Sequence, residues 1–194
     1  MGKIGRITEK GTITEFALPQ PSQASGFPSS ITVGPDGALW FTEPGANKVG
    51  RMTLQGTVTQ FALPVDRDNS AFAQGDSPGA ITVGPDKALW FVKSHAIGRI
   101  TAQGRVTDFP VSTENDSELD DITAGPDGAL WFTVSSSDQM GRITVGGTIT
   151  MFNEPTSYSE PGNANIIVTG PDGALWFTEF ENNRIGRMQI SQHS

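Results

Sequence analysis

The sequence has no cysteine among its 194 residues, and it has only two histidines and one tyrosine. Without cysteine, the chain has no disulfide framework, no thiolate nucleophile and no zinc–thiolate site. The net charge of −8 speaks against a nucleic-acid partner, because phosphate binding needs a basic surface. No apolar run approaches the length that spans a membrane, and the stretch MGKIGRITEK lacks the apolar core of a signal peptide. We therefore expect neither nucleic acid nor membrane as a partner, and a cytoplasmic location by default.

What the sequence has in abundance is repetition. The phrase GPDGALWFTE recurs with small changes, and its copies hold all four tryptophans. These copies begin at Gly34, Gly84, Gly125 and Gly170. A second phrase, KVGRMT, recurs around Gly5, Gly50, Gly98, Gly141 and Gly186, which lie 45, 48, 43 and 45 residues apart. A third, GTVTQFALP, has a counterpart after each of the first four copies of the second, and a period of this length is typical of repeat architectures.

The phrases predict four short strands in each repeat. ITV and ALWFT flank a Pro-Asp-Gly turn, and VGRMT and TVTQF flank a Leu-Gln-Gly turn. We name these strands A, B, C and D. Four antiparallel strands every 40–45 residues indicate an all-β fold, a β-propeller of about four blades, in one domain over residues 1–194. The A–B phrases lie near 31–43, 81–93, 122–134 and 167–179.

The chain starts out of phase, at strand C. Its order is CD, then ABCD three times, then ABC. A ring closes when the first and last segments share a blade. The N-terminal D strand would then complete the last blade, and one C strand would be left over.

The phrases GPDGALWFTE, NKVGRMT and GTVTQFALP strongly resemble the repeats of the virginiamycin B lyases, also called streptogramin B lyases, over essentially the whole chain. The resemblance implies a seven-bladed propeller and an enzyme that linearises cyclic streptogramin B antibiotics by elimination with Mg²⁺, which confers antibiotic resistance. Four blades are too few for that ring. A fragment, a small four-bladed relative and a half-ring that forms an eight-bladed homodimer all remain open.

Residues that recur in every repeat are interpreted as structural, because a catalytic residue is needed only once. This applies to the tryptophans as core aromatics. It applies equally to the aspartates of the turns and to the arginines of strand C, which we expect to tie neighbouring blades together. The aspartates are Asp36, Asp86, Asp127 and Asp172, and the arginines are Arg6, Arg51, Arg99, Arg142 and Arg187.

Function is expected where the repeat is broken. The resemblance implies catalytic histidines just before strand A in two adjacent blades, and a glutamate in the B–C loop. The positions before strand A hold Ser29, Gly79, Asp120 and Asn165, so no histidine base is carried over. His95, in the loop VKSHAIG, is the one candidate base, although an exposed loop residue is the preferred interpretation. His193 lies in the C-terminal tail.

Two further groups are candidates for ligand or metal binding. Glu118, Asp120 and Asp121 lie in the acidic stretch STENDSELDD and are candidate oxygen ligands for Mg²⁺ or Ca²⁺, with a solvated acidic loop as the alternative. At the end of strand B the repeats differ. There the candidates for the ligand face are Glu43, Lys93 and Glu179, with Val134 in the remaining repeat and Glu181 in the last B–C loop.

Two functions compete on these grounds. The preferred one is a lyase-like propeller that binds a small molecule or peptide at its central opening without catalysis. The alternative is a Mg²⁺-dependent carbon–oxygen lyase on a cyclic depsipeptide. A third reading, a propeller fragment that assembles into a full ring, fits the out-of-phase start.

Overall fold

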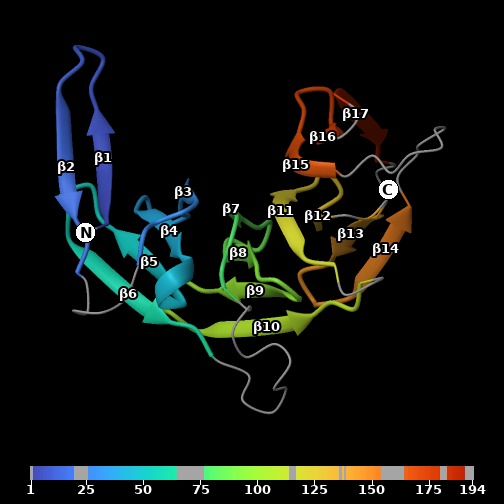
Figure 1. Cartoon of the computed structure of the whole chain (residues 1–194), viewed down its shortest axis with the longest axis horizontal. Helices are drawn as coiled ribbons and strands as arrows, with labels where there is room; N and C mark the ends of the chain where they lie inside the picture. Colours follow the sequence, from blue (N-terminus) through green and yellow to red (C-terminus); the bar gives the residue numbers. More distant parts are fainter. Residues whose placement is uncertain are drawn as a thin grey trace.

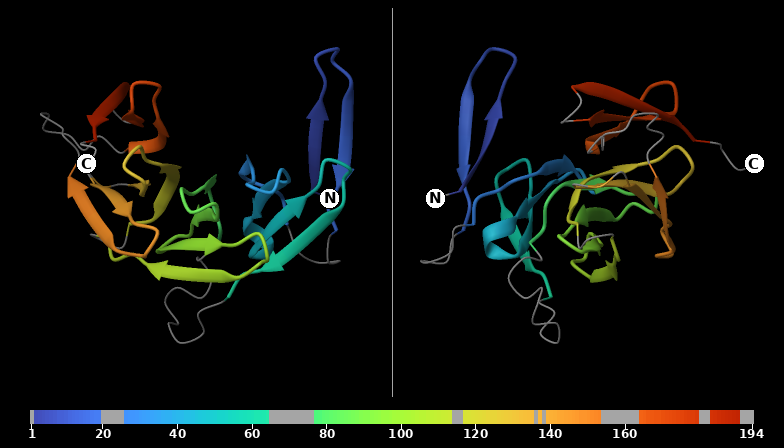
Figure 2. Two further views of the ribbon diagram at one scale, coloured as in Figure 1. Left: turned by 180° about the vertical axis from the view of Figure 1, so that it is seen from behind. Right: turned by 45° about the vertical axis from the view of Figure 1, so that its right-hand side comes forward.

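The structure is a computed structural model that describes residues 2–19, 26–64, 77–113, 117–135, 137, 139–153, 164–179 and 183–190. In those ranges every regular element is a β-strand except one short 3₁₀ turn, η1 (Pro44–Ala46). The strands form five antiparallel sheets that follow one another along an arc (Figures 1 and 2). The predicted all-β class is confirmed. No helix in the described ranges is long and apolar enough to cross a membrane.

The strands follow the predicted order. The N-terminal hairpin pairs β1 (Lys3–Ile7) with β2 (Ile13–Ala17). Blade 1 contains β3 (Ile31–Val33), β4 (Leu39–Glu43), β5 (Lys48–Met52) and β6 (Val58–Ala62). Blade 2 contains β7 (Ile81–Val83), β8 (Leu89–Val92), β9 (Ala96–Ile100) and β10 (Val106–Pro110). Blade 3 contains β11 (Leu119–Ala124), β12 (Leu130–Val134), β13 (Gln139–Ile143) and β14 (Ile149–Asn153). Blade 4 contains β15 (Ala164–Thr169), β16 (Ala174–Glu179) and β17 (Arg184–Gln189).

The A strands β3, β7, β11 and β15 line the concave side of the arc, and the D strands β6, β10 and β14 lie on its convex side (Figure 1). The N-terminal hairpin and blade 4 lie at opposite ends, in separate sheets. The ring closure considered from the sequence is therefore not formed within this chain. The hairpin instead packs on blade 1, where Ile4 and Leu18 share an apolar cluster with Phe41 and Met52.

Strand B forms the core of each blade because both of its faces are apolar. Trp40 and Phe41 point to opposite faces of β4, and both are fully buried. Phe41 lies against Gly50 of strand C so closely that a side chain there would clash with the ring. This contact explains the glycine in the repeated IGR motif. Trp40 stacks on Phe61 of strand D at 5.5 Å and packs against blade 2. Burial of each such aromatic side chain contributes about 2 kcal/mol or more.

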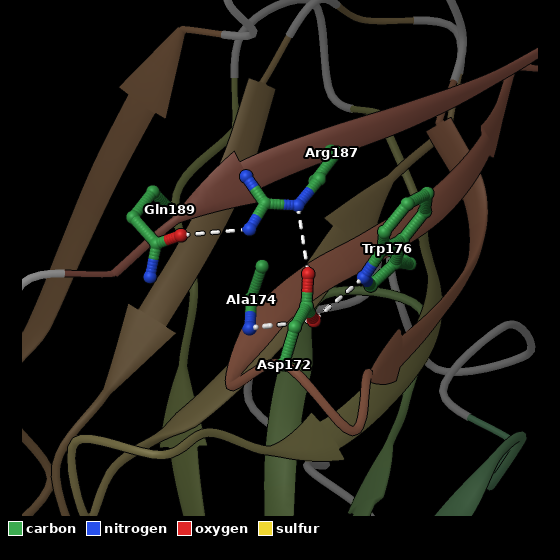
Figure 3. A network of polar contacts seen from close by, with 5 residues as sticks. All are labelled: Asp172, Ala174, Trp176, Arg187 and Gln189. Atoms are coloured by element: carbon green, nitrogen blue, oxygen red, sulfur yellow. Dashed lines mark hydrogen bonds and ion pairs between the residues drawn. The ribbon is translucent and has the colours of Figure 1, made fainter.

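A network of three residues fixes the A–B turn in every blade, and Figure 3 shows the copy in blade 4. Trp176 Nε1 donates to Asp172 Oδ1 at 3.0 Å, and Arg187 Nε donates to Asp172 Oδ2 at 2.9 Å. The same contacts join Asp36, Trp40 and Arg51 in blade 1. The expectation that these arginines tie neighbouring blades together is wrong. In the four blades, strand C brings each guanidinium beside the A–B turn of its own sheet, so the tie lies within the blade.

Candidate functional site

The candidate site is the inner rim, which we define as the positions directly before or at the start of strand A: Ser29, Gly79, Asp120 and Asn165. Ser29 and Asn165 are exposed, whereas Gly79 and Asp120 are half-buried. Main-chain pairing continues to this edge, because Ser29 N donates to Thr42 O at 3.0 Å and Gly79 N donates to Val92 O at 2.8 Å. The rim side chains are therefore carried by sheet rather than by free loops.

Asp121 connects the rim of blade 3 to blade 4. Its Oδ1 accepts a hydrogen bond from Ile122 N at 2.8 Å, and its Oδ2 accepts one from Ile167 N of β15 at 2.9 Å. Burial raises the pKa of Asp121, and these two hydrogen bonds oppose that shift. Ser30 makes the corresponding contact between blades 1 and 2, where its hydroxyl accepts from Ile81 N at 3.2 Å. Both carboxylate oxygens of Asp121 therefore accept backbone hydrogen bonds, one from its own strand and one from the neighbouring blade.

Asp120 is the carboxyl group among the four rim residues, and its pKa is strongly raised. Burial raises its pKa to about 6, and the negative charges of Glu118 and Asp121 add to this effect. Glu118 itself is exposed, and its carbonyl is held by Ser135 N at 2.8 Å. Asp120 therefore changes its charge near neutral pH at the point where the lyase resemblance places a histidine.

The acidic stretch gives no convergent metal centre in the part of the chain that the structure describes. No three histidine or carboxylate side chains there are placed to hold one ion. Glu114 and Asp116 of the same stretch lie outside the described residues. The assignment of Glu118, Asp120 and Asp121 as metal ligands stays a prediction.

The residues at the end of strand B lie inside the blades and face partners on strand D. Glu43 is fully buried, and Gln60 Nε2 donates to its two carboxylate oxygens at 2.8 and 3.1 Å. Lys48 Nζ donates to Gln60 Oε1 at 3.2 Å and completes the group. Glu43 therefore fastens strand D to strand B, and its role as a ligand contact stays untested.

The other blades carry a chemically different pair at the same two positions. In blade 2, Lys93 is 2% exposed and forms an ion pair with Asp108 at 3.0 Å. In blade 3, Val134 and Met151 pack in one apolar cluster. Sequence reasoning missed these B–D pairs, although the two positions change together from repeat to repeat. Glu179 holds the corresponding position in blade 4 and is 9% exposed, and Glu181 lies outside the described residues.

His95 is half-buried in the B–C loop of blade 2 rather than exposed. Its carbonyl accepts from Val111 N at 2.9 Å, and the preceding Ser94 carbonyl accepts from Leu119 N of β11 at 3.1 Å. These bonds tie the loop to the end of β10 and to the start of blade 3. His193 lies outside the described residues.

Comparison with known proteins agrees with this architecture. A catalytically inactive virginiamycin B lyase from Staphylococcus aureus, solved with quinupristin, is 41% identical with a TM-score of 0.84, and the match covers 99% of this chain and 61% of that chain. A streptogramin B lyase structure is 35% identical with a TM-score of 0.79, and the match covers 99% of this chain and 63% of that chain. This chain therefore spans less than two thirds of the length of these lyases.

A more distant solved structure supports the fold alone. The β-propeller domain of Swd1 from Myceliophteria thermophila is 10% identical with a TM-score of 0.71, over 97% of this chain and 64% of that chain. A comparison with curated proteins found no match. The model of the Virginiamycin B lyase family matches residues 1–72 and 69–193. On this match and on the similarity to the solved lyases, the chain belongs to the virginiamycin B lyase family.

Proposed function

We propose that this chain is a ligand-binding scaffold with the family fold, and that it does not carry out the lyase reaction. The observation that carries the proposal is the composition of the inner rim. An elimination needs a base held against the proton that is removed. The family resemblance places an imidazole directly before strand A in two adjacent blades, and the four equivalent positions of this chain hold Ser29, Gly79, Asp120 and Asn165.

The rim suits a ligand rich in amide and ester groups. Asn165 and Ser29 expose an amide and a hydroxyl, which both donate and accept hydrogen bonds. The pKa of Asp120 is raised to about 6, so both of its protonation states are populated near neutral pH. Its carboxylate accepts hydrogen bonds, and its protonated carboxyl group also donates one. One similar lyase structure contains quinupristin. We therefore propose a cyclic depsipeptide of the streptogramin B type as the ligand class.

The alternative of a lyase rests on Asp120. Its carboxyl replaces an imidazole at one rim position, and a pKa of about 6 is suitable for a general base. The Mg²⁺ that the family implies finds no fitting group of ligands among the described residues. We therefore derive no step through the ion.

The two functions are separated by measuring binding and ring opening on the same samples. Binding of quinupristin is followed by isothermal titration calorimetry, and the ligand is then analysed by HPLC with and without Mg²⁺. We expect saturable binding with the ring intact, and weaker binding by Asp120→Ala. Glu9→Ala, at the exposed turn between β1 and β2, is the matched control and should bind normally. A linear product would establish the lyase alternative, and absence of binding would refute this ligand class.

A further inference from the structure

The hydroxyl of Thr133 connects the A strands of blades 3 and 4. It accepts a hydrogen bond from Asp121 N of β11 at 3.1 Å and donates one to Asn165 O of β15 at 2.7 Å. Thr133 lies on β12 and is fully buried, so water does not compete for these bonds. The main chain next to Asp120 and the main chain of Asn165 are therefore linked through a single oxygen atom.

A second hydrogen bond crosses the same junction. Asp121 Oδ2 accepts it from Ile167 N at 2.9 Å. Blade 3 thus donates one bond to β15, at the carbonyl of Asn165, and accepts one from it, at the N–H two residues later. Buried polar groups that are satisfied in this way make the local structure rigid. The rim positions 120 and 165 are therefore held at a fixed spacing.

The other two junctions between complete strands A lack this pair of bonds within the described ranges. Between blades 1 and 2, Ser30 Oγ accepts from Ile81 N at 3.2 Å, whereas the Thr42 hydroxyl accepts from Ser30 N of its own blade at 3.2 Å. Between blades 2 and 3, the equivalent residues are Ala80 and Val92, whose side chains have no polar atoms. The junction of blades 3 and 4 is therefore the one suited to hold two rim side chains in register.

We propose that Asp120 and Asn165 act together as the specificity-determining pair of the rim, and that Thr133 is the residue that positions them. This inference rests on the proposed binding of a depsipeptide. A carboxylate accepts hydrogen bonds, and a carboxamide both donates and accepts them. The pair matches a peptide group of the ligand, because the carboxylate can accept from its N–H while the carboxamide donates to its C=O.

A double-mutant cycle tests whether the two rim residues act together. Asp120→Ala, Asn165→Ala and the double variant are compared with the unmodified protein for quinupristin affinity by isothermal titration calorimetry. Side chains that bind one group of the ligand are coupled, so we expect the double variant to bind about as weakly as the weaker single variant. Losses of affinity that simply add would show that the two residues act independently, and would overturn the pair.

The second test isolates the Thr133 hydroxyl. Thr133→Val removes it at nearly equal volume, as Val92 does in blade 2, and Thr133→Ser keeps it. Thr42→Val is the matched control, because Thr42 is the equivalent, fully buried residue of blade 1. We expect quinupristin affinity to fall about fivefold in Thr133→Val, the equivalent of one hydrogen bond, and to change less than about twofold in Thr133→Ser and in the control. Equal losses in the two valine variants would refute the positioning role.

A measurement without ligand separates this inference from the proposed function. The side-chain amide signals of Asn165 are recorded by NMR with and without the substitution Asp120→Ala. We expect the substitution to shift these signals in the wild-type and Thr133→Ser backgrounds, and to shift them less in Thr133→Val. No shift in the wild type, or the same shift in Thr133→Val, would overturn the inference. The expected pattern in a protein that does not bind quinupristin would refute the ligand class and support the arrangement of the pair.

Discussion

At the scale of single residues, Lys87 occupies a backbone conformation that suits glycine. Its φ is +59°, and the equivalent turn residue Gly37 has φ of +73°. The turn is otherwise the same, because Lys87 N donates to Gly84 O at 3.0 Å. A non-glycine residue in this region costs about 1 kcal/mol or more. We expect Lys87→Gly to raise the free energy of unfolding by about 0.5 kcal/mol, since the greater freedom of glycine in the unfolded chain offsets part of the gain.

Urea unfolding measures this difference. Lys10→Gly serves as the control, because Lys10 is an exposed turn residue that does not have a positive φ. The control should leave stability unchanged or lower it. A loss of stability in Lys87→Gly would show that the lysine side chain contributes more than the strain removes.

Asp120 gives a second prediction at this scale. Its pKa of about 6 lies above the ordinary value of 3.8, so folding favours its protonated form. Its contribution to stability is present below pH 3.8 and is lost as the pH rises to about 6. We expect Asp120→Asn to stabilise the protein by about 1 kcal/mol at pH 7, allowing for partial solvation, and by much less at pH 3.5.

The measurement is urea unfolding at both pH values. Glu118→Gln removes a neighbouring charge at an exposed position and should have a smaller effect. A gain that is the same at both pH values would mean that the introduced amide acts by hydrogen bonding and that ionisation of the Asp120 carboxyl is not the cause.

At the scale of elements, the network of aspartate, tryptophan and arginine joins strands B and C to the A–B turn. Burial raises the pKa of Asp86, but hydrogen bonds from Trp90 and Arg99 more than offset this, so the pKa is lowered. The stability that it contributes is therefore present above pH 3.8 and is lost as the pH falls below that value. We expect Asp86→Asn to cost about 1–2 kcal/mol at pH 7 and little at pH 2.

A matched substitution exists in blade 4. Asp172 makes the same contacts as Asp86, but its side chain is 38% exposed against 18% for Asp86. Asp172→Asn should therefore cost less than Asp86→Asn when thermal unfolding is compared at pH 7. Equal losses would indicate that the turn geometry, rather than burial of the network, sets the contribution.

The strands and turns could be predicted from the sequence because the signals for each of them lie within a single repeat. Pro-Asp-Gly gives the turn, and the apolar run ALWFT gives the buried strand. The order from strand C onward followed from the same phrases. The direction of the arginine contacts and the pair of Glu43 with Gln60 could not be derived, because they depend on which residues the strand register brings side by side. The rim residues were identified by position alone, and the raised pKa of Asp120 depends on burial that the sequence does not show.

At the scale of the whole molecule, an apolar residue of strand C is exposed at each end of the arc. Ile7 at the N-terminal end is 69% exposed, while the equivalent Met52 is 2% exposed. At the other end, Ile185 is 64% exposed, while the equivalent Ile97 is fully buried. Between neighbouring blades these two positions lie on faces that pack together. We therefore expect head-to-tail association of this chain that rises with concentration.

Light scattering on a sizing column tests this expectation. Ile7→Lys blocks one end, and Ile185→Lys blocks the other. Head-to-tail pairing predicts that each variant alone closes no ring, whereas a mixture of the two forms a dimer through the intact ends. A wild-type protein that remains monomeric at high concentration would exclude this assembly.

The different B–D pairs of the three complete blades also bear on how the chain folds. Nearly identical repeats carry the hazard that a strand joins the wrong sheet during folding. Strand β10 in blade 3 would place Asp108 against Val134, and strand β14 in blade 2 would remove the contact between Lys93 and Asp108. Each exchange separates a charged side chain from the partner that it has in its own blade. Blade 1 has a hydrogen bond between strands B and D, blade 2 has an ion pair and blade 3 has an apolar contact. These different contacts favour pairing of each strand D with the strand B of its own blade.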